Sequence, residues 1–281
     1  MKKVFLIVLF IFNLNLMFSQ SDEVVELVPK ETTKRLSLAL DIVYPYLWRG
    51  LQYNGEKIAF QPSLSYNLTD RLSIGIWGTT NFSNASDAYN EFDWSVSYQF
   101  SPSFSILLED YYWPATRNNT DWEKRNYFDY SEGSAQSIDL SVIVDLSENG
   151  IPIDFQWSTL IGGNDYKYDI NQNRKRAFSS YAEIGYTYTQ EKLGLDFRPF
   201  LGAAIINGGY YGVDANGNAG FTWTNVGFNV AKEIMITEKY NIPVFIRYSY
   251  NEYGVQQFDQ FDQIAKTKRN FISSGITFNL E

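Results

Sequence analysis

The chain contains neither cysteine nor histidine. Without cysteine it has no disulfide, no thiolate nucleophile, no cysteine-ligated metal and no lipidated anchor cysteine. Without histidine it lacks the usual general base near neutral pH and the commonest metal ligand. These absences exclude a Ser-His-Asp hydrolase and any barrel phospholipase or protease that depends on histidine. An enzyme would need a carboxylate pair such as Glu109 and a neighbour. We therefore predict no enzymatic activity, no metal and no cofactor.

A basic surface stripe and a long apolar run inside the mature chain are also absent. The formal net charge is −9, and phosphate contacts require Lys and Arg, so we expect no nucleic-acid partner. After the first segment, no run approaches the roughly 20 apolar residues of a membrane helix. A strand of a membrane barrel needs no such run, because only every second side chain faces lipid.

The first segment is typical of a secretory signal peptide. Lys2 and Lys3 precede an apolar run and then a small residue, Ser19. The alternative is a membrane anchor helix, but the run is short for that and is broken by Asn13 and Asn15. The predicted division of the chain is a signal peptide over residues 1–20, a short periplasmic segment over 21–34 and a β-barrel over 35–281.

Alternation of apolar and polar residues fills the chain after residue 35. Phe92, Trp94 and Val96, for example, alternate with Asp93 and Ser95, the period of a β-strand. From Phe104 to Trp113 the pattern falters, since Asp110 falls on the apolar face; either a bulge shifts the phase or Asp110 lies among the lipid headgroups. About twelve segments alternate: 36–42, 60–67, 72–76, 91–100, 104–113, 138–145, 153–158, 183–188, 195–202, 226–230, 244–251 and 272–280.

The connections between these segments alternate in length. The short ones lie near residues 69–71, 101–103, 146–152, 189–194 and 231–241. The long ones lie near residues 51–57, 83–90, 114–134, 162–176, 207–220 and 252–268. This rhythm predicts an all-β, up-and-down antiparallel transmembrane barrel of about 12 strands, with short periplasmic turns and long extracellular loops, in the outer membrane of a Gram-negative bacterium.

The polarity of the second face decides between a membrane barrel and a soluble one. A soluble β-barrel or cup places apolar residues inside and polar residues outside. Here the second face carries Ser, Asn, Gln, Gly and charge, which would make a poor dry core. We therefore expect the apolar face to meet lipid and the polar face to line a wet interior, with a soluble secreted β-protein as the rival interpretation.

A family resemblance covers roughly residues 36–80. The run Tyr44-Pro45-Tyr46-Leu47-Trp48-Arg49-Gly50 is followed by Gln61-Pro62-Ser63-Leu64-Ser65-Tyr66 and then by Gly75-Ile76-Trp77-Gly78. This resembles the start of the TorF-type putative porins, in which an aromatic-x-Arg-Gly turn precedes a hairpin closing in Gly-x-Trp. The resemblance implies an outer-membrane barrel that forms a pore, with no catalytic residues to transfer. Pro45 departs from the family pattern and is expected to bend the first strand.

Charged residues on the inward face are the candidate functional residues. Acidic ones outnumber arginines, and charged rings in a pore select ions by sign. We expect a passive channel for small hydrophilic solutes with a weak preference for cations. The alternative is a closed, plugged barrel, cross-braced by arginine–carboxylate pairs, that serves as a structural or cell-surface interaction protein through its loops. The predicted lumen-lining residues are Asp41, Arg49, Asp93, Glu109, Asp139, Asp154, Glu183, Asp196, Arg198 and Arg247.

Three smaller expectations complete the sequence interpretation. Gly275, Ile276 and Phe278 form a polar-Gly-apolar-x-aromatic pattern that resembles the signal read by the barrel assembly machinery, an expected partner besides outer-membrane lipid. The loops at Asp169 and Asp214 look a little like calcium loops, but turn-forming Asn, Asp and Gly explain them better. Five tryptophans lie near predicted strand ends, where interfacial girdles form, with Trp77 and Trp223 expected to point inward: Trp48, Trp77, Trp113, Trp157 and Trp223.

Overall fold

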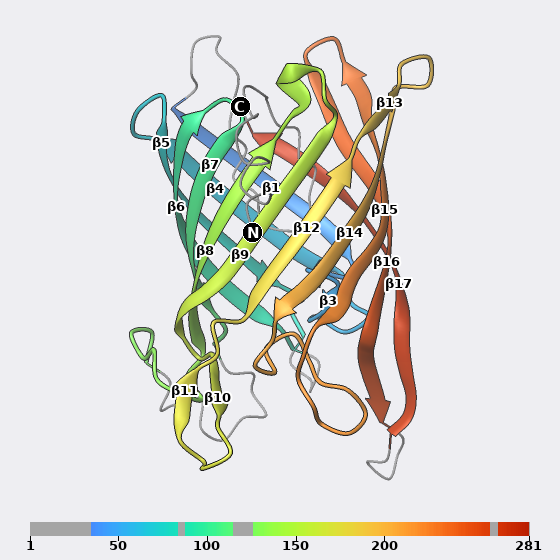
Figure 1. The fold of residues 1–281 in the computed structure, drawn as a ribbon. Helices are drawn as coiled ribbons and strands as arrows, with labels where there is room; N and C mark the ends of the chain where they lie inside the picture. The colour runs from blue at the N-terminus through green and yellow to red at the C-terminus, as the bar shows by residue number, and fades with distance from the viewer. Residues whose placement is uncertain (1–34, 84–87, 115–125, 259–263, 281) are drawn as a thin grey trace, which may run out of the picture.

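The computed structural model is a closed antiparallel β-barrel and describes residues 35–83, 88–114, 126–258 and 264–280 (Figure 1). Twelve strands form the wall, in the spatial order β12-β9-β8-β7-β6-β5-β4-β1-β17-β16-β15-β14, and β12 pairs with β14 to close the circle. This confirms the predicted up-and-down barrel. The wall strands are β1 (Leu36–Tyr44), β4 (Ala59–Asn67), β5 (Leu72–Thr80), β6 (Asn90–Ser101), β7 (Phe104–Tyr112), β8 (Gln136–Asp145), β9 (Ile153–Gly163), β12 (Ser180–Tyr186), β14 (Leu195–Ile206), β15 (Thr222–Thr237), β16 (Tyr240–Phe258) and β17 (Ile264–Leu280).

The remaining elements are short. A strand β13 (Tyr188–Gln190) continues the line of β12 along β14, and a 3₁₀ turn η2 (Ser147–Asn149) joins β8 to β9. Two small hairpins stand apart from the wall: β2 (Leu47–Trp48) with β3 (Leu51–Gln52), and β10 (Tyr166–Tyr168) with β11 (Arg174–Arg176). Within the described ranges, no helix is long and apolar enough to cross a membrane.

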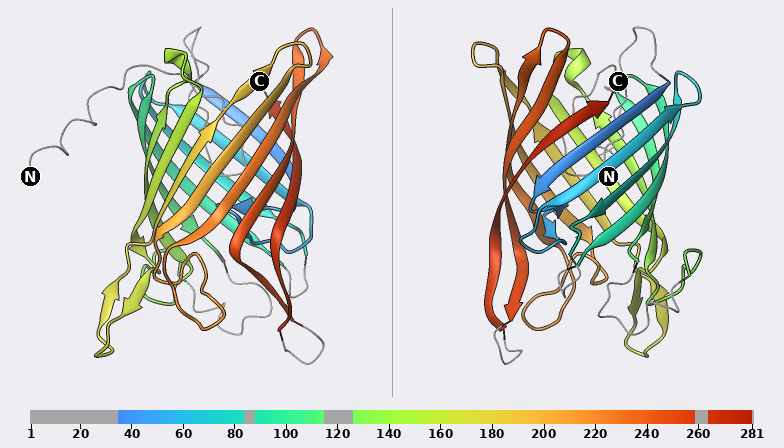
Figure 2. Two further views of the ribbon diagram at one scale, coloured as in Figure 1. Left: turned by 45° about the vertical axis from the view of Figure 1, so that its right-hand side comes forward. Right: turned by 180° about the vertical axis from the view of Figure 1, so that it is seen from behind.

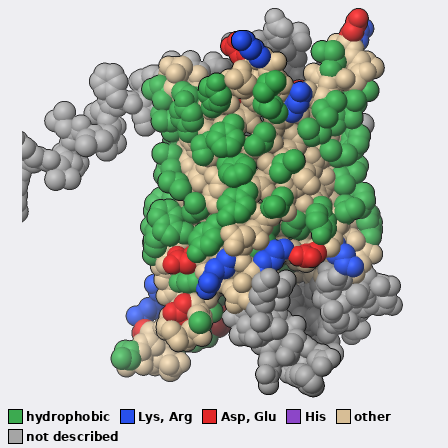
Figure 3. All heavy atoms as spheres, turned by 90° about the vertical axis from the view of Figure 1, so that its right-hand side faces the viewer, with side chains coloured by type: hydrophobic (Ala, Val, Ile, Leu, Met, Phe, Trp, Pro, Cys, Tyr) green, Lys and Arg blue, Asp and Glu red, His purple; other side chains and the backbone are tan. Residues whose placement is uncertain are grey.

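The apolar face of the wall points outward and the polar face inward. Ile246 of β16 and Ile272 of β17 are 58% and 69% exposed, whereas Ser249 and Ser273, which lie three and one residues further along the same strands, are completely buried. Figure 3 shows hydrophobic side chains spread over the middle of one side, with charged side chains gathered toward its two ends. Closure of the barrel pairs the backbone of every wall strand on both sides, which lipid contact requires.

The two ends of the barrel differ as predicted. The short turns lie at the upper end in Figures 1 and 2, together with the start of β1 and the end of β17, and the long loops lie at the lower end. Two of the predicted connections are shorter in the structure than the sequence indicated, because the strands on either side extend into them. The ladder of β15 and β16 continues to Thr237 and Tyr240, and that of β16 and β17 to Phe258 and Ile264. These ribbons extend the backbone pairing past the barrel rim, where no alternation of polarity is needed.

A bulge in β15 overturns one prediction about a side chain. Gly202 of β14 pairs with Asn225, but the next residue, Ala203, pairs with Trp223, so Thr224 is an extra residue in the ladder. An extra residue reverses the phase of the strand beyond it. Trp223 therefore points outward and is 41% exposed, and the expectation that it faces inward was wrong.

No bulge occurs at Asp110. The pairing of β7 with β6 and β8 runs through this residue without a shift, so Asp110 stays on the outward face. Its carboxylate is nevertheless buried, because the hydroxyl of Tyr130 and the side-chain amide of Gln136 both donate hydrogen bonds to it. The loop residue Tyr130 thus covers this carboxylate near the long-loop end.

Candidate functional site: the barrel interior

A hairpin folded into the barrel occupies its interior toward the long-loop end. We call residues 45–55 the inner hairpin. β2 and β3 are its two strands, and Arg49 and Gly50 form its tip, both with positive φ (48° and 77°). Two central residues with positive φ are the signature of a type I′ turn, which favours glycine at the second position. The side chain of Asn54 accepts a hydrogen bond from the backbone N–H of Tyr46 at 2.8 Å and joins the two arms.

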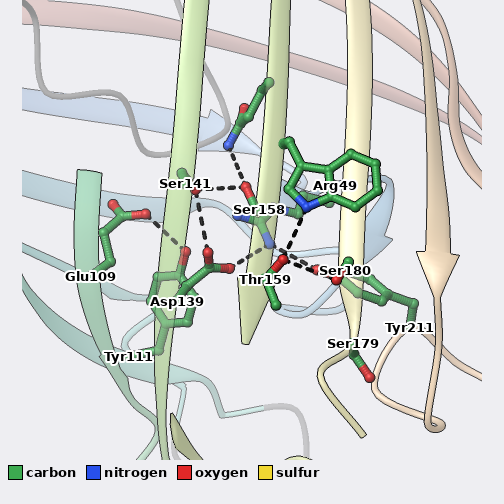
Figure 4. A network of polar contacts seen from close by, with 12 residues as sticks. Arg49, Glu109, Tyr111, Asp139, Ser141, Ser158, Thr159, Ser179, Ser180 and Tyr211 are labelled. Atoms are coloured by element: carbon green, nitrogen blue, oxygen red, sulfur yellow. Dashed lines mark hydrogen bonds and ion pairs between the residues drawn. The ribbon is translucent and has the colours of Figure 1, made fainter. Parts of the chain in front are cut away.

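Arg49 at the hairpin tip is anchored to the barrel wall. Its guanidinium donates to Oδ2 of Asp139 on β8 at 2.7 Å and to the hydroxyl of Tyr211 at 2.8 Å (Figure 4). The side chains of Arg49 and Asp139 are 2% and 0% exposed. Charge-assisted hydrogen bonds of this kind are among the strongest available to a protein side chain. Glu109 of β7 pairs in register with Asp139, and its carboxylate accepts from Tyr111.

Aromatic rings surround the hairpin. The ring of Trp48 stacks on Tyr211, with centroids 5.8 Å apart and planes 7° apart, and meets Tyr111 of β7 edge-on at 5.6 Å. Tyr46 contacts Trp77 of β5 at 5.7 Å. The aromatic cluster, as we call it, therefore joins the hairpin to β5 and β7 of the wall. Its members are Tyr46, Trp48, Tyr53, Trp77, Tyr89, Tyr111, Trp113, Tyr181, Tyr210 and Tyr211.

The other side of the hairpin lies against β15, β16 and β17. The carbonyl of Gly50 accepts a hydrogen bond from the side chain of Asn251 at 3.1 Å, and the carbonyl of Pro45 accepts from Ser273 at 2.7 Å. β1 ends at Tyr44, directly before Pro45. The expected bend at Pro45 is thus the point where the chain leaves the wall and enters the barrel.

A second polar group lies on strands nearer the short-turn end. Arg198 of β14 donates to both oxygens of Asp154 on β9 and, at 2.8 Å, to Glu183 on β12. Asn225 donates to Glu183 at 2.7 Å and accepts from Ser249. Arg247 of β16 lies over the ring of Phe200 at 4.6 Å and interacts electrostatically with Glu183. Two arginines and two carboxylates balance within this group, which we call the arginine quartet: Asp154, Glu183, Arg198 and Arg247.

Three predicted lumen residues lie apart from both groups. Asp41 on β1 accepts from the hydroxyl of Thr277 on β17. Asp93 on β6 is 3% exposed and accepts from the backbone N–H of Tyr112 at 3.1 Å. Asp196 lies at the start of β14 beside Thr189, at the short-turn rim. Asp41 and Asp93 share the polar face of the wall, whereas Asp196 is a rim residue.

The loops once compared with calcium sites are closed by their own backbone. Oδ1 of Asp169 accepts from the amides of Asn171 and Asn173, and Oδ1 of Asp214 accepts from those of Asn216 and Asn218. These hydrogen bonds hold the pKa of both carboxyls below the ordinary range, with the amides of Asn173 and Asn218 the largest causes. Throughout the part of the chain that the structure describes, no three acidic residues are placed to hold a metal ion.

The placement of polar and apolar side chains identifies the environment of the barrel. Backbone groups can cross a membrane as strands only when the sheet is closed. An apolar outer belt, a polar interior and short turns at the end holding both described termini are the attributes of bacterial outer-membrane barrels. The protein is therefore an outer-membrane β-barrel. The predicted signal peptide (1–20) and periplasmic segment (21–34) lie outside the described residues.

Comparison with known proteins gives the family. Residues 29–246 match a family described as a bacterial protein of unknown function, Gcw_chp. The chain belongs to this family. No curated protein matches the chain.

Solved structures similar to this Gcw_chp chain are outer-membrane channels. The NanC porin is 12% identical over 86% of this chain and 100% of its own, with a TM-score of 0.48. An outer-membrane channel from Pseudomonas putida F1 is 13% identical over 87% and 94%, with a TM-score of 0.42. OccK8 (OprE) from Pseudomonas aeruginosa is 11% identical over 88% and 68%, with a TM-score of 0.39. These likenesses are distant, so the fold assignment depends on the strand pairing and side-chain placement described above.

Sequence reasoning missed the inner hairpin. Residues 51–57 were expected to be an extracellular loop, whereas β3 lies against β16 and Asn54 is completely buried. One signal was available: Tyr46, Leu47 and Trp48 are consecutive large apolar residues that break the alternation, and all three are less than 5% exposed. Such a run fits a segment buried on all sides better than a wall strand or an extracellular loop.

Proposed function

We propose that this barrel is a porin-like channel for small hydrophilic solutes, passive and with a weak preference for cations. The observation that carries the proposal is the polar interior of the closed twelve-stranded wall, where seryl, carboxylate and arginine side chains are buried while the apolar residues face outward. Barrels of this strand number lie between those filled by side chains and those with a wide aqueous channel. The resemblance of residues 36–80 to the TorF-type putative porins supports the same function.

The balance of interior charge supports the cation preference. The arginine quartet is neutral as a group, and Arg49 offsets one carboxylate, that of Asp139. Glu109 and Asp93 add two more buried carboxyl groups on the neighbouring strands β7 and β6, so carboxyl groups outnumber arginines on the inward face. A cation passing this side of the wall would be attracted, and an anion repelled.

A second candidate function is favoured by the inner hairpin. A hairpin anchored on several sides of the wall would narrow or close the barrel, which would then act as a structural or cell-surface interaction protein through its long loops. The β10–β11 hairpin is an exposed element of that end, with Ile170 95% exposed at its tip. Neither function uses a catalytic residue or a cofactor.

The proposal also includes partners. The outward belt would contact outer-membrane lipid, and Gly275, Ile276 and Phe278 on the last strand would be read by the barrel assembly machinery. Gly275 has a packing role as well, because a Cβ there would lie 2.5 Å from the ring of Phe245. A substitution at Gly275 would therefore affect the folded barrel as well as its assembly.

Current through the refolded protein in a planar bilayer tests the channel. We expect a reversal potential on the cation-selective side in a salt gradient, and a shift toward zero for Asp93→Asn combined with Glu109→Gln. Glu132→Gln is the matched control, because this carboxylate is 36% exposed in the long-loop region and is screened by salt. A wild-type protein that selects anions would contradict the charge assignment, and the absence of current from any folded variant would contradict the channel.

A further inference from the structure

The inner hairpin contacts the wall on opposite sides of the barrel. Its contacts run to β5 through Trp77, to β7 through Tyr111, to β8 through Asp139 and to β12 through Tyr181. On the opposite side they run to β16 and β17 through Asn251 and Ser273. In the circular strand order β7 and β16 lie half a turn apart. The hairpin therefore crosses the interior from one wall to the other.

The hairpin is nevertheless separate from the barrel ladder. β2 pairs only with β3, and neither belongs to the sheet that forms the wall. Side-chain contacts and a few hydrogen bonds to its backbone carbonyls anchor it. Displacing it would leave the backbone pairing of all twelve wall strands intact.

Gly50 determines how closely the hairpin fits against the wall. A Cβ at this position would lie 1.7 Å from the backbone oxygen of Thr224, the extra residue of the β15 bulge. Because the obstructing atom is backbone, neither a rotamer change nor a small shift of a side chain could relieve the clash. Any side chain at residue 50 would therefore push the hairpin tip away from β15.

The interior surface near the hairpin differs from the wall closer to the short turns. Large rings fill the former, whereas small hydroxyl side chains such as Ser141, Ser158 and Ser249 are common on the latter. Ser141 and Ser158 lie on the short-turn side of the Arg49–Asp139 pair and hydrogen-bond to each other, as Figure 4 shows. The bulk that narrows the interior is thus contributed by the hairpin and its aromatic partners.

We propose that the inner hairpin is the element that sets the conductance and the solute size limit of this barrel, held in place by the fit of Gly50 against Thr224 and by the Arg49–Asp139 pair. This inference rests on the proposed channel function. The residues that determine specificity are then those at the hairpin tip and not those of the wall alone. A barrel whose hairpin is displaced would pass more current and larger solutes.

Gly50→Ala tests the inference, with Gly217→Ala as its matched control. Both glycines have positive φ, 77° and 82°, but a Cβ at Gly217 would meet nothing within 4 Å. The control therefore carries the same backbone strain without the clash. We expect a several-fold rise in single-channel conductance for Gly50→Ala and the wild-type value for Gly217→Ala.

The position of the hairpin can be measured independently of current, because the chain has no cysteine. Leu47→Cys places one thiol at a completely buried position, and Ile170→Cys places one at a 95% exposed position. We expect slow labelling of residue 47 by a water-soluble thiol reagent in the parent and in Gly217→Ala, and fast labelling in Gly50→Ala. Residue 170 should label fast in every background.

The outcomes separate the inference from the function on which it rests. Fast labelling of residue 47 with unchanged conductance would overturn the inference and leave the channel intact, and slow labelling in a folded Gly50→Ala barrel would overturn the proposed fit. If no folded variant conducts, the channel function itself is wrong. Should Gly50→Ala not fold, Trp48→Ala combined with Tyr211→Ala removes the stacked pair without altering the backbone, and unchanged conductance in that variant would also overturn the inference.

Discussion

The two charged groups inside this barrel are held in different ways. The arginine quartet lies entirely on the wall, and Arg198 is shared by two carboxylates, Asp154 and Glu183. Arg49 lies on a hairpin outside the wall sheet and pairs with the carboxylate of Asp139 on the wall. Wall residues are positioned by the ladder whether or not their side chains pair. The hairpin, in contrast, depends on its side chains for its position. Arginine–carboxylate pairs therefore link strands of the wall to one another in the first region and anchor a separate element to the wall in the second.

The largest effect is expected for Asp139→Ala. Removing one member of a buried, hydrogen-bonded ion pair costs about 3–5 kcal/mol. Arg49 would retain only the hydroxyl of Tyr211 among the hydrogen bonds described above. We expect the free energy of unfolding, measured by urea denaturation of the refolded barrel, to fall by that amount, or conductance to rise if the hairpin leaves its site instead. A variant unchanged in both measurements would show that the pair does not anchor the hairpin.

Asp154→Ala is expected to cost less, which sharpens the comparison. Arg198 keeps its bond to Glu183, so its charge stays paired, and the loss of the two charge-assisted hydrogen bonds to Asp154 should cost about 2–3 kcal/mol. Conductance should stay close to the wild-type value, because the quartet is part of the wall and no hairpin depends on it. The same urea titration and bilayer recording measure both quantities. If the free energy of unfolding fell as much as for Asp139→Ala, the remaining carboxylate, Glu183, would not be compensating the charge of Arg198.

The wall was predictable from sequence for a physical reason. Each strand has one face in lipid and one in the polar interior, so alternation of period two is imposed all along it, and Phe92 to Phe100 shows it without a fault. The face on which a residue lies can be read from the sequence only while that period persists. The extra residue Thr224 inverts the phase, which is why Trp223 was assigned to the wrong face.

The position of the hairpin could not be derived in the same way. Its anchors come from residues distant in sequence, such as Asp139, Tyr211 and Asn251, and nothing in local periodicity brings them together. Arg49 and Asp139 were both expected in the lumen, but their pairing depends on a turn that redirects the chain at Pro45. The run of apolar residues before Arg49 was the one local sign that this segment is buried.

The smallest effect is expected outside the barrel, at Glu56 and Lys268. Lys268 donates to Glu56 at 2.6 Å just beyond the inner hairpin, but the carboxylate is 58% exposed. The hydrogen bond from Lys268 lowers the pKa of Glu56. Whatever stability the pair adds is therefore present above the pKa of an unfolded glutamate and is lost as the pH falls through the lower folded value. Because solvent and salt screen an exposed pair, Glu56→Gln should change the free energy of unfolding by less than about 0.5 kcal/mol.

That small value discriminates between two ways of holding the hairpin. If it is held from inside, by Arg49 and the fit of Gly50, the outer pair is dispensable, and Glu56→Gln should leave both conductance and the labelling of Leu47→Cys as in the parent at any salt concentration. If the hairpin were instead held by its outer arm, Glu56→Gln would release it, and wild-type conductance would rise with added salt as the pair is screened. Recording conductance in low and high salt for both proteins, normalised to bulk conductivity, separates these cases.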